Sequence, residues 1–136
     1  MVALTEDRNT PRREGLDFVY PMVANTTIFA GALVMLNASG QARPGAVATG
    51  QRAVGRAEER KTNGSVAGAE TIRVTPGIFR YANSAAADEI VQADVGANCF
   101  IVDDQTVAKT NGSNSRSVAG TVMSVEPAGV WVKIGL

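Results

Sequence analysis

The chain contains no histidine and a single cysteine. Without histidine it lacks the side chain that most often serves as a general base, as a zinc ligand or as the partner of a nucleophilic serine or cysteine. One cysteine, Cys99, excludes a disulfide within the chain. Because Cys99 stands in the apolar run 99–102, we expect it to be a small buried side chain.

Net charge and aromatic side chains are also scarce. Lys+Arg and Asp+Glu each number 13, so no overall basic field attracts nucleic acid. Aromatic residues make up 5% of the chain, whereas alanine and valine supply most of the 45% that is hydrophobic. A core of such small residues buries little area per side chain, which leaves room for stabilisation by neighbouring subunits.

Long apolar segments are absent as well. No run approaches the length of a membrane-spanning helix, and the polar start of the chain, residues 5–9, is unlike a signal peptide. We therefore expect synthesis in a reducing cytoplasm and no membrane partner.

Acidic residues are the remaining candidates for chemistry. Asp103 and Asp104 are adjacent, but they stand in a predicted turn, where aspartate accepts backbone hydrogen bonds. A calcium ion there would need further oxygen ligands that are not evident. An enzyme built on carboxylates alone would need Asp17, Asp103 and Glu126 to converge in one cleft. We expect no catalytic residue, cofactor or metal, and no enzymatic activity.

Turn-forming residues recur at short intervals and divide the rest of the chain into short strands. The sequence predicts an all-β fold, a small barrel or sandwich of short antiparallel strands, with residues 16–136 as a single domain. Asn63-Gly64 is a hairpin signal. Ser84 is expected to cap one short helix over 85–93, which ends by Gly96.

The last predicted strand, 130–134, has two different faces. Val130, Val132 and Ile134 share one face, and Trp131 and Lys133 share the other. Trp131 has two interpretations, a core tryptophan or an outer side chain at a subunit contact.

Tyr81 is the second candidate for an oligomer contact. Together with Trp131, we assign it to the outer face of the predicted barrel. There it would help form a dimer or a trimer.

Residues 1–15 form an N-terminal arm without apolar periodicity. The arm is either a frayed terminus or a tether that becomes ordered against a partner. Under the second interpretation, its polar residues are the candidate contacts: Arg8, Asn9, Arg12 and Arg13.

Two stretches of the chain share a pattern. The segment 31–36 begins with Gly-Ala and continues apolar, as does 96–101. The segment 53–57 has its glycine where 118–122 has one, and both matches are separated by 65 positions. A shared separation indicates a duplicated β unit. We expect the two units to close their hydrophobic faces on each other.

Seven motifs give the chain a family resemblance over nearly its whole length. They are DRNTP (7–11), AGALV (30–34), NASG (37–40), AVGRAE (53–58), GIFRYANS (77–84), VDDQTVA (102–108) and GVWV (129–132). In combination they resemble the capsid cement, or head decoration, proteins of tailed bacteriophages. The motifs mark strands and turns, so the resemblance brings no catalytic residue.

The resemblance implies a structural role on the outer capsid surface of a virion. Such proteins bind the assembled phage head, bridge its major capsid protein subunits and stabilise the shell. The implied partners are the major capsid protein and further copies of the chain. An alternative is a phage surface module that recognises a host glycan or receptor, which clustered exposed aromatic side chains would favour. A DNA-associated protein is a weaker alternative, since the formal net charge is zero.

Overall fold

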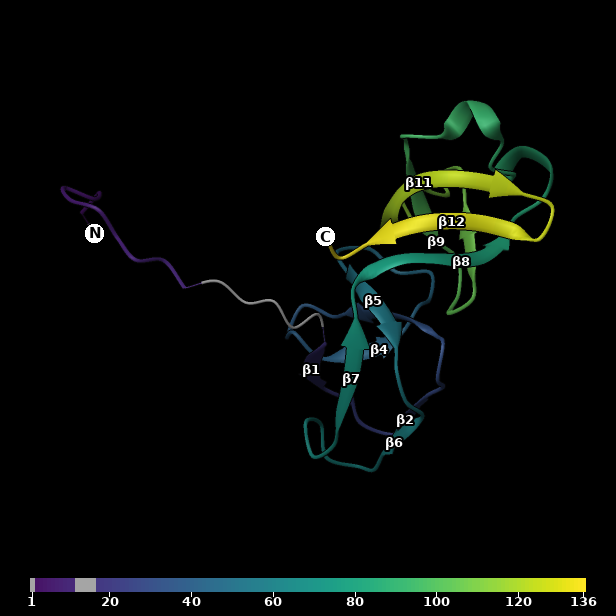
Figure 1. Ribbon diagram of the computed structural model, residues 1–136. Helices are drawn as coiled ribbons and strands as arrows, with labels where there is room; N and C mark the ends of the chain where they lie inside the picture. The colour runs from purple at the N-terminus through teal and green to yellow at the C-terminus, as the bar shows by residue number, and fades with distance from the viewer. Residues whose placement is uncertain (1, 12–16) are drawn as a thin grey trace.

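A computed structural model describes residues 2–11 and 17–136 of the chain. In these ranges the regular structure consists of strands and two single-turn 3-10 helices (Figure 1). The prediction of an all-β fold is confirmed. The described residues include no helix with the length and apolarity needed to cross a bilayer.

The first half of the chain forms an open five-stranded sheet. Its strands follow the spatial order β1-β7-β5-β3-β4. Their bounds are β1 (Phe18–Pro21), β3 (Leu33–Leu36), β4 (Ala42–Pro44), β5 (Arg52–Ala57) and β7 (Thr71–Thr75). A small two-stranded sheet, β2 (Thr26–Ile28) with β6 (Lys61–Asn63), completes this first unit.

The second half forms a closed five-stranded barrel. Its strands follow the order β8-β12-β11-β9-β10, and β10 returns to β8. Their bounds are β8 (Gly77–Asn83), β9 (Asn98–Ile101), β10 (Thr106–Ala108), β11 (Val118–Glu126) and β12 (Gly129–Ile134). Figure 1 shows this barrel beside the first unit, with β8 continuing from β7. The closing pair β8–β10 is parallel, which differs from the wholly antiparallel arrangement that the sequence predicts.

The two units repeat each other strand by strand. The order β1-β7-β5-β3-β4 corresponds to β8-β12-β11-β9-β10. Val34 is opposite Gly55, and the register then shifts in the β3–β5 ladder. Cys99, 65 positions after Val34, is opposite Gly120, and the same irregularity interrupts β9–β11. A common order with a common bulge supports the predicted duplication.

Glycine is required at both matched bulge positions because another strand passes close by. A Cβ on Gly55 would lie 2.2 Å from the carbonyl oxygen of Thr75, and a Cβ on Gly120 would lie 2.0 Å from that of Lys133. Both distances are far below a van der Waals contact. The glycines of the repeat therefore permit the close approach of β7 to β5 and of β12 to β11.

The first unit differs from the barrel in the pairing of its two outermost strands, β1 and β4. In the barrel, the N–H of Ala82 donates to the carbonyl of Gln105 at 2.8 Å, which helps join β8 to β10. In the first unit, β1 and β4 meet through one isolated parallel bridge, Met22–Ala42. Pro21 occupies the position of Ala82 and has no N–H to donate. The missing donor accounts for the incomplete pairing of β1 with β4.

Each unit encloses its own cluster of buried hydrophobic side chains. The first cluster contains Met22, Ile28, Ala32, Val34, Ala42, Ala57, Ile72 and Val74. The second contains Leu33, Met35, Tyr81, Ile90, Cys99, Ile101, Val107, Ala119, Val122, Val130, Val132 and Ile134.

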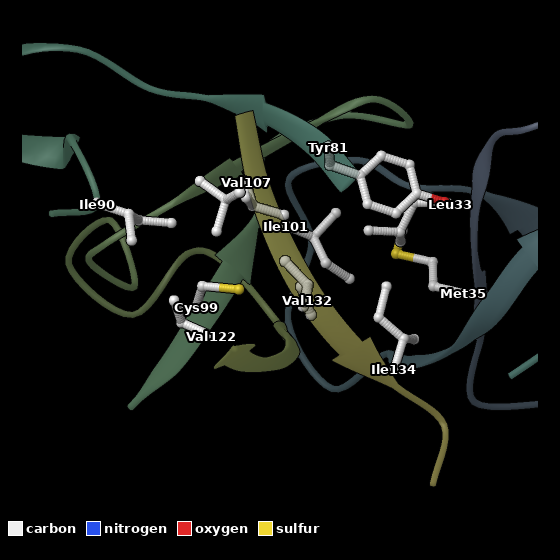
Figure 2. Packing of buried hydrophobic residues seen from close by; sticks show 12 residues of the cluster. Leu33, Met35, Tyr81, Ile90, Cys99, Ile101, Val107, Val122, Val132 and Ile134 are labelled. Atoms are coloured by element: carbon white, nitrogen blue, oxygen red, sulfur yellow. The ribbon is translucent and has the colours of Figure 1, made fainter. Parts of the chain in front are cut away.

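The strand β3 is shared between the two clusters. Val34 belongs to the first cluster, whereas Leu33 and Met35 belong to the second. Figure 2 shows Leu33 and Met35 beside Tyr81 and Ile134, at one end of the barrel cluster. The predicted contact between two hydrophobic faces is therefore wrong. The units enclose separate cores, and one face of β3 covers an end of the barrel.

The predicted helix over 85–93 is also wrong. This segment contains two single 3-10 turns, η1 (Ala86–Asp88) and η2 (Gln92–Asp94), separated by extended backbone. Ala86 has φ +55°, outside the helical region. Ser84 donates its hydroxyl to the carbonyl of Val107 at 2.8 Å and does not cap a helix.

The Asn63-Gly64 pair does not form the predicted hairpin. Strand β6 pairs with β2, and a loop connects it to β7. The buried Asn63 amide donates to the carbonyls of Met22 (3.2 Å), Val23 (3.0 Å) and Val66 (3.0 Å). Asn63 therefore fastens the loop to the first unit.

Candidate interaction surfaces

The N-terminal segment 2–11 is exposed along its whole length. Arg8 and Thr10 make local contacts, a hydrogen bond from Arg8 Nη1 to Thr10 Oγ1 at 3.2 Å and one from the Thr10 N–H to the Arg8 carbonyl at 2.9 Å. Asn9 is exposed between them. Arg12 and Arg13, the other predicted arm contacts, lie outside the described residues. The side chains of Arg8 and Asn9 are thus accessible to a partner.

Trp131 lies on the outer face of the barrel, half-buried, while its neighbours Val130 and Val132 point inward. The guanidinium carbon of Arg80 lies 5.8 Å from the centroid of its ring. Arg80 also contacts Glu126, with 3.1 Å between Nη1 and Oε1. Of the two interpretations of Trp131, the structure favours the outer side chain over the core tryptophan, and its role in a subunit contact stays a prediction.

Tyr81 does not lie on the outer face, which corrects the prediction made for it. Its side chain is 6% exposed and belongs to the barrel cluster. In the ladder it is opposite Val130, which points inward, so the alternation of β8 directs Tyr81 inward too. Its hydroxyl donates to the carbonyl of Gly31 at 3.3 Å. Burial raises the pKa of Tyr81 strongly, so the phenol stays neutral.

The three carboxylates considered for an enzyme have separate local partners. Asp17 accepts a hydrogen bond from Thr75 at 2.6 Å, Glu126 pairs with Arg80, and Asp103 accepts the N–H of Gln105 at 2.9 Å. The last bond is the turn contact predicted for Asp103. Across residues 2–11 and 17–136, no group of three or more His, Cys, Asp or Glu side chains is arranged to hold a metal ion.

Cys99 is a free, fully buried cysteine in the barrel cluster. The apolar surroundings raise the pKa of its thiol to about 12, so it is protonated at neutral pH. The prediction of a small buried side chain is confirmed.

Phe29 is a surface feature that the sequence analysis did not identify. It follows β2 directly, is 51% exposed, and has the Arg60 guanidinium carbon 5.0 Å from its ring centroid. It borders a hollow of about 410 Å³ at the junction of the two units, together with Ala30, Gly31, Ala32, Asp104 and Gln105. Phe29 lies just before the bend at Gly31, where φ is +87°, and therefore outside strand β3.

The barrel exposes a second apolar surface on β9 and β11. Val118 and Met123 are each 43% exposed, and Phe100 is half-buried. Phe100 and Val118 are opposite each other in the ladder. The internal repeat is the signal that could have identified this surface, because it places Phe100 and Val118 at the positions of Met35 and Ala53.

Comparison with known proteins adds no relative. No protein-family model matches the chain, and no curated protein or solved structure matches it either.

Proposed function

We propose that the protein is a capsid cement, or decoration, protein of a tailed bacteriophage. It would bind the outer surface of the phage head and bridge major capsid protein subunits. The observation that carries the proposal is the exposed segment 2–11. It precedes two β units that share strand β3. A stiff body with an extended arm can span a boundary between subunits.

The family resemblance supports the same role. The motif at 30–34 covers the bend at Gly31 and the start of β3, and the motif at 102–108 covers the β9–β10 turn and β10. The motif at 129–132 lies in β12. These segments shape the two units and the contact between them, as expected for a protein that acts by adhesion.

The arm supplies the contact that depends on an assembled shell. An exposed segment loses conformational entropy when it docks, but it extends the interface across a neighbouring subunit. Arg8 and Asn9 offer hydrogen-bond donors there, and Arg12 and Arg13 carry the same chemistry in the sequence. Several copies on one head would add their weak contacts through a high effective concentration.

A capsid-binding experiment tests the proposal. Deletion of residues 2–14 is expected to leave the β units folded and to weaken binding to undecorated heads at least tenfold. The measurements are cosedimentation of purified protein with heads, imaging of the occupied shells and the temperature of shell rupture. Full-length protein that ignores the heads would contradict the cement role, and a truncated protein that binds them with unchanged affinity would contradict the role of the arm.

A variant that removes polar groups without shortening the arm separates the effect of the arm's side chains on binding from the effect of its length. Arg8→Gln with Asn9→Ala keeps the segment but removes two polar contacts, and we expect intermediate binding. Thr62→Ala on β6 is the matched surface control, since Thr62 is exposed and its hydroxyl contacts only Thr27 among the described interactions. Equal weakening by the control would count against a specific arm contact.

Neighbouring exposed aromatic rings would favour the alternative function, which is recognition of a host glycan or receptor. Phe29 and Trp131 belong to different units and each has its own arginine neighbour. Binding of the purified protein to a glycan array, lost on Trp131→Ala or Phe29→Ala, would support this alternative.

A further inference from the structure

The contact between the two units uses the outer face of β3 and β5. Leu33 and Met35 enter the barrel cluster, and Ala53 packs against the same cluster. Arg56 lies over the ring of Phe79 on the barrel. This face of the first unit therefore covers one end of the barrel.

The repeat places a matching face on the barrel itself. Sixty-five positions after Met35 and Ala53 stand Phe100 and Val118, paired in the ladder as their counterparts are. Met35 is fully buried, whereas Phe100 is half-buried and Val118 is 43% exposed. The barrel thus presents to solvent two of the apolar positions that its counterpart uses for the contact between units, whereas the position of Leu33 is taken by the exposed Asn98.

The repeat also gives the first unit a counterpart of the covered end of the barrel, which we call the receiving end. In the barrel, Tyr81 and Ile101 form part of the covered end and are buried. Tyr20 and Leu36 hold the same ladder positions in the first unit, and both are half-buried. A hollow of about 300 Å³ opens beside Leu36, lined also by Asn37, Ala38, Ser39, Gly40, Gly50 and Arg52.

We propose that chains associate head to tail through these two surfaces. The β9–β11 face of one copy, centred on Phe100 and Val118, covers the first unit of the next copy at Tyr20 and Leu36. The occupant is a second copy because the chain already contains the same contact between its own halves. The inference deepens the homo-oligomer of the proposed function, and it requires no capsid.

The polar pattern of the internal contact is repeated at the proposed one. Tyr81 donates its hydroxyl to the carbonyl of Gly31 across the units. The counterparts are Tyr20 and Gly96, and Gly96 has φ +92°, close to the +87° of Gly31. We therefore expect the Tyr20 hydroxyl of one copy to donate to the Gly96 carbonyl of its neighbour.

A head-to-tail contact has a definite consequence for assembly. The two surfaces differ, so an assembly keeps one unused surface at each of its two ends and continues to grow as an open chain unless a ring closes. An isologous dimer, in contrast, would bury the same surface patch on both copies. This difference makes the geometry testable in solution.

The first test is the concentration dependence of the oligomer, measured by sedimentation velocity of the full-length protein without capsids. Val118→Glu places a charge on the β9–β11 face, and Ala38→Arg fills the hollow beside Leu36. Each is expected to raise the dissociation constant at least tenfold. Val66→Glu is the matched control, because Val66 is 65% exposed on the β6–β7 loop, and it should leave association unchanged. Thermal melting followed by circular dichroism verifies that each variant is folded.

The second test mixes the two variants. Val118→Glu keeps the receiving end and Ala38→Arg keeps the β9–β11 face, so an equimolar mixture should form heterodimers that do not grow further. A monomer at all concentrations, or association unaffected by Val118→Glu, would overturn the proposal. Loss in both variants without recovery on mixing would overturn it as well. None of these outcomes depends on capsid binding, so the cement role is tested separately.

Discussion

The guanidinium carbon of Arg56 lies 4.5 Å from the centroid of the Phe79 ring, across the junction of the two β units. The same guanidinium donates to Glu58 Oε1 through Nε at 3.0 Å and Nη2 at 2.7 Å. Glu58 thus holds the cation in place over the ring. This arrangement links β5 to β8 at the edge of the apolar contact made by β3.

Arg56→Ala is expected to destabilise the protein by about 1 kcal/mol, since it removes a cation–π contact at a partly exposed site. The measurement is the free energy of unfolding from urea denaturation. Lys133→Ala is the control, because Lys133 is a basic residue that stands exposed on β12. Equal losses in the two variants would show that the stacking on Phe79 contributes nothing specific.

Gly120→Ala is expected to cost about 3 kcal/mol or to prevent folding, because the new methyl group would overlap the Lys133 carbonyl and force β11 away from β12. Gly55→Ala should behave similarly, since its methyl group would overlap Thr75. Soluble yield and melting temperature report both effects. Gly64→Ala is the control, as its Cβ would meet no atom within 4 Å, and a comparable loss there would refute the close-approach argument.

The shared strand β3 predicts that the two units unfold together. Trp131 is the single tryptophan and lies in the barrel, so its fluorescence reports on the second unit alone. Val34→Ala removes two methyl groups from the core of the first unit, at a cost of about 2 kcal/mol. We expect the denaturation midpoint of Trp131 fluorescence to fall together with that of far-UV circular dichroism. An unchanged fluorescence midpoint would mean that the barrel unfolds independently.

Cys99 predicts a loss of stability at high pH. Burial raises the pKa of its thiol from 9.0 to about 12, so above pH 9 the unfolded chain releases a proton that the folded chain retains. The free energy of unfolding should therefore fall between pH 9 and pH 12, by at most about 1.4 kcal/mol per pH unit from this group. Burial raises the pKa values of Tyr20 and Tyr81 as well, which steepens the fall above pH 10.

Urea denaturation at pH 8, 9 and 10 measures this dependence, with Cys99→Ala as the comparison. The variant starts from a lower stability because of the small cavity, but its decline from pH 9 to pH 10 should be shallower. Parallel curves for the two proteins would assign the decline to other groups. Slow reaction of the native thiol with a disulfide reagent at pH 8 is a second expected result.

Strand positions could be predicted because they depend on local alternation. The inward faces of β7 and β12 follow from Ile72 and Val74 in one strand and from Val130 and Val132 in the other, all of which are buried. The separation of 65 positions also indicated the repeat. Local patterns do not predict how the two repeats are arranged. That arrangement depends on how β3 divides its side chains between the two cores.

Long-range contacts account for the errors. Asn63-Gly64 favours a tight turn locally, but the Asn63 amide has three carbonyl partners in the first unit. The segment 85–93 is rich in alanine, yet Asn83 binds both the N–H and the carbonyl of Ile90, which holds that segment against the barrel. Tyr81 is predicted to lie outside because the mixed apolar and polar pattern of β8 carries no local signal for which face is inward.

Strand β3 has apolar side chains on both faces, so each half of the molecule depends on the other for its stability. A fragment ending at Thr75 would carry Leu33 and Met35 into water, and a fragment beginning at Gly77 would lose the side chains that seal its barrel. Either piece produced alone should aggregate or be digested by proteases. The repeated halves are therefore expected to survive in the cell only as one continuous polypeptide.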